Sequence, residues 1–319
     1  MDFHEKFEVF LPELKQALTV PGTTDWSVKG FIDTYKNIYS ITTDTKVISK
    51  VIEIMIFPCL LRFAKDNGLT IRLPPHQNYY PDVTFIDSEG NKYAVDLKTT
   101  YRITDESVNG MTLGAFTGYF RNRSSYKNVL FPYEKYKKHY VLGVIYSRSD
   151  IDSITTLLTD NGFQLTAAKR KLLISYMNNA SDDNWDLLAA CYPNAIADYR
   201  NRIDSYLVDE LESYNLDNFE GMVSVARRFD FFFQEKWKLA VDRPGSGNTK
   251  NIGSETLIKR LLKGEGLFFR EYGESGEVEF DKYWMQYQTK DMATILGQDA
   301  PIYKNLQTFK QWLLSLQNS

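Results

Sequence analysis

The chain has 319 residues, 43% of them hydrophobic, which is enough to bury one sizeable core with an appended subdomain. Cys59 and Cys191 are the only cysteines, so no disulfide framework is indicated, and we find neither a signal peptide nor an apolar run of the roughly 20 residues that cross a bilayer. A cytoplasmic location is therefore expected. The net charge of −3 and the pI near 5.8 are atypical of DNA-binding proteins, so any nucleic-acid surface requires charge that is segregated along the chain.

The first predicted helix lies at the N-terminus. Its apolar positions recur at roughly helical spacing before Pro21-Gly22, and they are Phe3, Phe7, Val9, Phe10, Leu14 and Leu18. The sequence therefore predicts an amphipathic helix, for which packing within one subunit is the simplest role.

A second helix is predicted from residue 44 onward. Asp44 or Thr45 would cap it, and apolar side chains from Val47 to Met55 would form its stripe. Glu53 lies inside that stripe, where an unpaired carboxylate is costly to bury. We therefore expect Glu53 either to reach solvent or to meet a cation.

The next stretch predicts a β-hairpin. Two runs rich in β-branched and aromatic residues, 83–87 and 91–98, are joined by three residues that end in Gly90. A three-residue loop with glycine in the left-handed position is a common hairpin connection. It pairs Asp87 with Asn91, and this pairing sets the register of the whole hairpin.

That register gathers three charges at the open end of the hairpin. Asp82 falls opposite Asp96, and Lys98 points the same way as Asp96 because side chains alternate between the faces of a strand. Two neighbouring carboxylates repel unless a cation neutralises them, and hard oxygen ligands favour Mg²⁺, which suits phosphate substrates. The implied chemistry is metal-assisted phosphodiester hydrolysis, in which the lysine positions water or shields developing negative charge. A surface hairpin with a solvated Asp and Lys pair is the alternative.

Charge is indeed segregated. Residues 121–138 carry six lysines and arginines against Glu134 alone, a local net charge of +5. Residues 150–220 carry thirteen acidic residues against five cations, a balance of −8. The first segment could follow DNA phosphates, whereas the second would be repelled by them. A solvated charged face is the alternative for either segment.

The remaining elements are predicted from their patterns. His139–Tyr146 is a mostly apolar run that indicates a buried central strand, and Phe229–Phe233 and Lys236–Val241 also have strand composition. Several helical patterns between residues 150 and 215 indicate an inserted acidic subdomain. A final helix is expected over Tyr303–Leu316. The large apolar side chains near the C-terminus are expected in the core, and they are Trp284, Leu306, Trp312 and Leu313.

Residues 243–251, RPGSGNTKN, form a glycine-rich segment. Glycine lets a backbone approach another surface closely, Asn can bind adenine through two hydrogen bonds, and Thr can meet a thymine methyl group. The segment is therefore a candidate base-reading loop. A plain turn or a phosphate-binding loop is the alternative, although the lysine-serine ending of a P-loop is missing.

Four ordered stretches resemble one nuclease family. Pro81-Asp82, thirteen residues and then Asp96-Leu97-Lys98 resemble the PD-(D/E)xK signature, and their surroundings, NYYPDVTF and YAVDLKTTY, resemble the EcoRV-type type II restriction endonucleases. The other three stretches that resemble this family are DTKVISKVIEIMIFP at 44–58, TLGAFTGYFRN at 112–122 and GSGNTKNIGS at 245–254.

The resemblance implies an α/β fold. Its restriction-endonuclease-like core would be a mixed central β-sheet flanked by helices, with an inserted helical subdomain. The implied divisions are an N-terminal helical and dimerisation region at 1–43, a catalytic core at 44–149, the inserted acidic helical subdomain at 150–220, and the recognition loop with the C-terminal part of the core at 221–319.

The resemblance also implies site residues. Asp82, Asp96, Lys98 and Glu53 would be catalytic, and Asp82, Asp96 and Glu53 would bind Mg²⁺. The loop that would read bases in the major groove comprises Gly245, Ser246, Gly247, Asn248, Thr249, Lys250 and Asn251. Minor-groove or backbone contacts would come from Gln77, Asn78, Thr45, Tyr101, Thr117, Arg121 and Lys127.

The implied activity is Mg²⁺-dependent cleavage of double-stranded DNA at a short palindrome that resembles GATATC, with blunt ends. Because one chain offers one site, cutting both strands implies a two-fold homodimer. A companion DNA methyltransferase is expected in the host, and no membrane partner is expected. Two alternatives stay open: a structure-specific or repair nuclease with the same signature, such as a junction resolvase, and a DNA-binding protein without catalysis.

Overall fold

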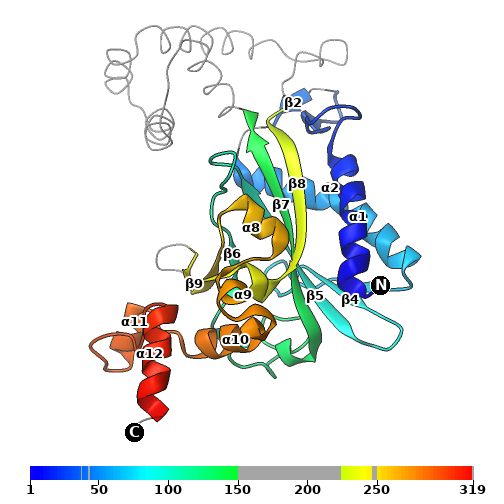
Figure 1. Ribbon diagram of the computed structural model, residues 1–319. Helices are drawn as coiled ribbons and strands as arrows, with labels where there is room; N and C mark the ends of the chain where they lie inside the picture. The colour runs from blue at the N-terminus through cyan, green and yellow to red at the C-terminus, as the bar shows by residue number, and fades with distance from the viewer. Residues whose placement is uncertain (37, 42–43, 150–223, 246–249, 318–319) are drawn as a thin grey trace, which may run out of the picture.

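Figure 1 shows a computed structural model of the chain. It describes residues 1–36, 38–41, 44–149, 224–245 and 250–317. The predicted acidic subdomain and four positions of the predicted recognition loop, 246–249, lie outside these residues.

A five-stranded mixed sheet forms the centre of the molecule, with the strand order β3-β4-β5-β7-β8. Its strands are β3 (Thr70–Arg72), β4 (Val83–Ile86), β5 (Lys92–Tyr101), β7 (Tyr136–Arg148) and β8 (Ala226–Glu235). β5 and β7 are parallel, whereas the other neighbours are antiparallel. β7 contains the predicted central strand and is almost wholly buried, as expected for an apolar run with covered faces.

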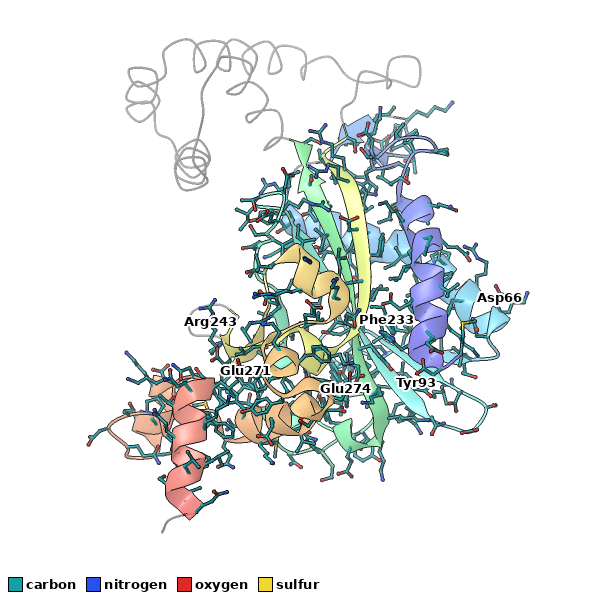
Figure 2. All side chains as sticks on the ribbon, in the orientation of Figure 1. Asp66, Tyr93, Phe233, Arg243, Glu271 and Glu274 are labelled. Atoms are coloured by element: carbon teal, nitrogen blue, oxygen red, sulfur yellow. The ribbon has the colours of Figure 1, made fainter. Side chains whose placement is uncertain are left out.

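Two helices cover one face of this sheet (Figure 1), namely α1 (Phe3–Leu18) and α2 (Thr45–Asp66). The side chain of Asp44 caps α2 by accepting hydrogen bonds from two backbone N–H groups. Phe3 stacks on Tyr93 of β5 with ring centroids 4.2 Å apart, and Phe7 stacks on Phe233 of β8 at 3.9 Å. Figure 2 labels both sheet residues beside the start of α1.

The apolar face of α1 is therefore used within its own chain. Its predicted members Phe3, Phe7, Phe10, Leu14 and Leu18 are all buried. The inclusion of Val9 was wrong, because this side chain is 69% exposed. Val9 lies on the opposite side of the helix from Phe7, since two residues turn an α-helix by about 200°.

The other face of the sheet carries a second layer. It contains a three-stranded antiparallel sheet of order β6-β10-β9, made of β6 (Thr112–Ala115), β10 (Asn251–Ser254) and β9 (Ala240–Pro244). Its helices are α8 (Ile258–Lys263), α9 (Leu267–Tyr272), α10 (Gly276–Gln286), α11 (Lys290–Ile295) and α12 (Leu306–Gln317). Trp284 and Leu306 are buried there, and Trp312 and Leu313 pack against the same core, which confirms their predicted placement.

The predicted strand at Lys236–Val241 was wrong over its first four residues, whereas its last two residues belong to β9. One helical turn, α7 (Lys236–Leu239), separates β8 from β9. Lys236, Trp237 and Leu239 are all buried, and Trp237 donates from Nε1 to Glu235 at 2.9 Å. Contacts with both layers therefore override the strand propensity of this segment.

Two smaller features complete the fold. β1 (Gly30–Ile32) and β2 (Ile38–Ser40) form an antiparallel hairpin after α1. None of the helices in the described ranges combines the length and apolar character that a membrane crossing requires. Helices on both faces of one mixed sheet confirm the predicted fold class.

Candidate active site

The β4–β5 hairpin has the predicted register. Val83 pairs with Val95 and Ile86 with Lys92, so the same alignment places Asp82 opposite Asp96 at the open end. Gly90 has φ of +84°, the region that a left-handed turn position requires and that side chains rarely adopt. The local turn thereby brings together two carboxylates that are fourteen positions apart.

The three central side chains contact one another or nearby backbone. Asp82 accepts a hydrogen bond through Oδ2 from the backbone N–H of Leu97 at 2.7 Å. Lys98 Nζ lies 2.5 Å from Asp96 Oδ2 in an ion pair. The side chain of Asp96 is only 10% exposed, so this ion pair is poorly screened by water. The structure thus places Asp82, Asp96 and Lys98 in one cluster.

The electrostatics of the cluster favour a cation. Burial, followed by the negative charge of Asp96, raises the pKa of Asp82 to about 7, although Lys98 and the Leu97 N–H oppose the shift. Burial alone would lower the pKa of Lys98, but the charges of Asp96 and Asp82 raise it above its ordinary value. Two carboxylates therefore share one site that a single ammonium compensates incompletely.

This donor set fits a hard divalent cation. Asp82 and Asp96 offer carboxylate oxygens, and Mg²⁺ is typically bound by one or two carboxylates together with water and substrate phosphate. Across the described ranges, no three His, Cys, Asp or Glu side chains already meet as a metal site. The structure therefore brings together two of the three predicted metal ligands and leaves Glu53 apart.

Glu53 lies on α2, across an open cavity of about 530 Å³ that Asp82, Leu97 and Gln77 also line. Lys50, three residues earlier on the same helix, donates to both carboxylate oxygens of Glu53 at 3.0 Å. Both expected outcomes are observed, because Glu53 pairs with Lys50 and its side chain is also 39% exposed. Glu53 faces the cavity from the side opposite the sheet, and its charge contributes to the raised pKa of Lys98.

The predicted DNA contacts are spread around this cavity. Gln77 and Asn78 are exposed in the turn before β4, and Thr45 is exposed at the start of α2. Tyr101 ends β5 half-buried, with the Arg148 guanidinium 5.1 Å from its ring centroid. Thr117 precedes the short helix η1 (Gly118–Phe120) and is also half-buried.

Much of the predicted basic segment is paired within the chain. Arg121 donates to the carbonyl oxygens of Trp284 and Tyr287 at the end of α10. Arg123 pairs with an aspartate of α10, and Lys138 pairs with glutamates of β8 and α10. The +5 counted along the sequence therefore overstates the charge that this segment presents to solvent.

Arg121 and Lys127 should consequently respond differently to the same substitution. Arg121→Met leaves buried carbonyl oxygens without their donor, so we expect the free energy of unfolding to fall by about 1–3 kcal/mol. Lys127 is exposed, so Lys127→Met should leave stability unchanged while it weakens duplex binding and reduces the salt slope by about one. Urea unfolding and fluorescence anisotropy measure the two quantities. Equal unfolding midpoints for Arg121→Met and wild type would contradict the structural role.

The described ends of the glycine-rich loop are held together. Gly245 donates from its backbone N–H to the Asn251 carbonyl at 3.1 Å, and the Lys250 carbonyl accepts from Phe116 at 3.0 Å. A Cβ on Gly245 would lie 2.9 Å from Thr112 Cγ2, so this glycine is required by close packing on β6. Ser246, Gly247, Asn248 and Thr249 lie outside the described residues. The sequence predicts that glycine in this segment lets the backbone approach another surface closely. At Gly245 that surface is β6 of the same chain.

Sequence reasoning missed Lys236. This lysine is buried on α7 near the central cluster, and the charge of Asp96 raises its pKa against a larger lowering by burial. The sequence offered only a lysine in an apparent strand, without a signal that its side chain turns inward.

Comparisons with known proteins agree with this geometry. A model of the restriction endonuclease EcoRV family matches residues 22–175 and 199–314. The chain is 28% identical over 291 residues to the type II restriction enzyme EcoRV of Escherichia coli, an alignment that covers 90% of this chain and 91% of that enzyme. The match spans the hairpin with Asp82, Asp96 and Lys98 and the flanks of the glycine-rich loop. The chain therefore belongs to the EcoRV restriction endonuclease family.

Proposed function

We propose that this protein is a type II restriction endonuclease that cleaves double-stranded DNA at a short palindrome with Mg²⁺ as its cofactor. The observation that carries the proposal is the cluster of Asp82, Asp96 and Lys98 at the open end of the hairpin. Membership of the family supports the same activity.

The residues of the cluster would have different roles in phosphodiester hydrolysis. Asp82 and Asp96 would hold Mg²⁺, with Glu53 assisting from across the cavity. When bound, the cation activates water and stabilises negative charge on the phosphorus centre. Lys98, whose ammonium pairs with Asp96, would orient the attacking water and shield the negative charge that develops on the phosphate.

Base recognition is proposed for the loop 245–251. Its described ends lie on β9 and β10, and Arg243, labelled in Figure 2, is near the end of β9. Backbone and minor-groove contacts are proposed for Thr45, Gln77, Asn78, Tyr101, Thr117, Arg121 and Lys127. Arg121 already binds two carbonyl oxygens, so its contribution would be to hold α10 close to DNA as well as to touch a phosphate.

A two-fold homodimer is part of the proposal. The described part of each chain carries one such cluster, and two copies related by a dyad match the symmetry of a palindrome. The apolar face of α1 is occupied internally, but large apolar side chains on and around the β1–β2 hairpin are exposed, and they are Phe31, Ile32, Tyr35 and Tyr39. This exposure supports a dimer contact within the region 1–43.

A nuclease of this kind would also cut the DNA of its own host. We therefore include in the proposal a companion methyltransferase that protects the recognition site. We also place the enzyme in the cytoplasm, where foreign DNA would meet it.

Digestion of a sequenced plasmid tests the proposed function. The purified protein should give discrete fragments with Mg²⁺ and none with EDTA, because the cleavage centre needs the cation. Sequencing of the ends should place blunt cuts within GATATC. Analytical ultracentrifugation with a duplex that carries this sequence should show two chains per DNA.

The possible results separate the parts of the proposal. Discrete fragments with ends at another sequence would support the nuclease activity and refute GATATC as the recognition sequence. Cleavage only of branched DNA would favour a junction-type enzyme. Tight duplex binding without any cleavage would reject the catalytic function.

A further inference from the structure

Lys236 is a buried lysine that the mechanism above does not use. It is 3% exposed, and its Nζ has no hydrogen-bond partner in the part of the chain that the structure describes. The ammonium instead lies 5.4–5.7 Å from the ring centroids of Tyr80, Phe120 and Tyr133. Cation–π attraction compensates such a charge only in part. Burial of an incompletely paired ammonium costs folding free energy, so a functional role for this lysine is worth examining.

The charges of Asp96 and Lys98 act on Lys236. Burial lowers the pKa of Lys236 to about 8, the charge of Asp96 opposes this shift, and the charge of Lys98 adds to it. The ammonium thus stays protonated at pH 7 and within the electrostatic reach of both residues. Tyr80, one of the rings that enclose it, directly precedes Pro81-Asp82. Lys236 therefore lies beside the centre without an ion pair to either carboxylate in the described structure.

Lys236 differs from Lys98 in its freedom to move. The Lys98 side chain is 24% exposed, so it can turn away from Asp96 when a cation arrives. Lys236 is enclosed by three rings, and a Cβ added to Gly114 would lie only 3.3 Å from its Nζ. A divalent cation at the two carboxylates would therefore be repelled by a positive charge that is held in place.

We propose that Lys236 is a positioning residue that weakens the intrinsic affinity of Asp82 and Asp96 for a divalent cation. Its ammonium attracts the Asp96 carboxylate when no cation is present, and it repels the cation when one binds. The negative charge of a DNA phosphate would offset this repulsion, so the cation is held best once DNA is in place. This inference rests on the proposed function only for the identity of the metal ligands.

The position of Lys236 in the chain links this charge to the candidate recognition loop. α7 continues directly into β9, which ends at Pro244, and Gly245 begins the loop. The buried ammonium and the candidate loop therefore lie on one continuous stretch of chain.

Metal binding by the whole protein without DNA tests the inference. Mn²⁺ would be titrated by calorimetry at pH 7 into wild type, Lys236→Met, Lys236→Arg and Lys238→Met. Methionine keeps an unbranched chain without the charge, and arginine keeps the charge. Lys238 is the matched control, since it lies on the same helical turn but pairs with Glu274 at 3.3 Å, away from the cluster. Figure 2 labels Glu274, which lies between α9 and α10 in the second layer.

Lys236→Met should lower the Kd for Mn²⁺ on the order of tenfold, because the positive charge that repels the bound cation is removed. Lys236→Arg and Lys238→Met should stay close to wild type. Lys236→Gln, also neutral, repeats the test if Lys236→Met fails to fold. Asp96→Asn should abolish binding and so locate the metal.

An unchanged or weaker Kd in both neutral variants would overturn the inference, as would the absence of Mn²⁺ binding in wild type and neutral variants alike. The outcome is independent of cleavage. A wild-type protein that binds Mn²⁺ but cuts no duplex would refute the proposed function, and the comparison of variants would still decide the role of Lys236.

Discussion

Asp96→Asn should lose cleavage by at least about a thousandfold, because it removes a carboxylate that would hold the cation and leaves Lys98 without its ion-pair partner. The side chain keeps its shape, so the β5–β7 pairing at this position should be retained. The expected loss is therefore in kcat rather than in the affinity for duplex DNA. Single-turnover cleavage of a labelled duplex and anisotropy with the same duplex measure the two quantities.

The hairpin supplies a matched control for this variant. Glu89 lies in the exposed turn, where its carboxylate accepts only a hydrogen bond from the Asn91 side chain among the described contacts. Glu89→Gln removes one negative charge from the same hairpin and should leave kcat within about twofold of wild type, since exposed charges contribute little. Comparable losses in both variants would show that general destabilisation of the hairpin, rather than the cluster, limits the rate.

The contribution of Asp82 to the stability of the metal-free protein should fall as pH rises from about 4 to about 7, because the folded state holds a proton on Asp82 that the unfolded chain releases. Burial and Asp96 raise the pKa of Asp82 to about 7, well above its ordinary value. Asp82→Asn removes this proton uptake while its amide oxygen can still accept from Leu97. We expect the variant to exceed wild type in unfolding free energy at pH 8 by at least about 1 kcal/mol, and to match it near pH 4.

Urea unfolding in EDTA at both pH values measures this difference. Asp87, on the same hairpin, provides a control because its pKa is shifted in the opposite direction. Slight burial opposes the shift, but hydrogen bonds from Asn91 and Tyr93 lower the pKa of Asp87, so Asp87→Asn should destabilise the protein at pH 8 and less so near pH 4. Added Mg²⁺ should stabilise wild type more than Asp82→Asn. If the free energy of unfolding rose between pH 4 and pH 7 by the same amount in wild type and in Asp82→Asn, Asp82 would have its ordinary pKa.

The central hairpin could be predicted closely from the sequence. Its register depends on a three-residue loop and on the alternation of side chains, both of which are properties of neighbouring residues. The same is true of α1, whose capping box joins Asp2 and Glu5 and whose buried phenylalanines follow the helical period. The placement of Asp82 opposite Asp96 follows from local geometry alone.

The charged residues outside the hairpin could not be placed in this way. Glu53 was expected to meet a cation or solvent, and only the structure identifies Lys50 as its partner. Arg121 belongs to a basic run along the chain, yet its guanidinium binds carbonyl oxygens more than 160 residues away. Such pairings depend on which elements pack together, and no local pattern specifies them.

The sequence by itself therefore determined the family, the hairpin and the identity of the three central charged residues. The hairpin and its charged residues follow from short-range periodicity and from a motif within one supersecondary unit, whereas the family follows from four ordered stretches along the chain. The tertiary structure alone decided that Lys236 on α7 is buried, with its ammonium among the rings of Tyr80, Phe120 and Tyr133. The physical reason is that strand propensity in this segment is weaker than the packing of two layers, and packing joins residues that are distant along the chain.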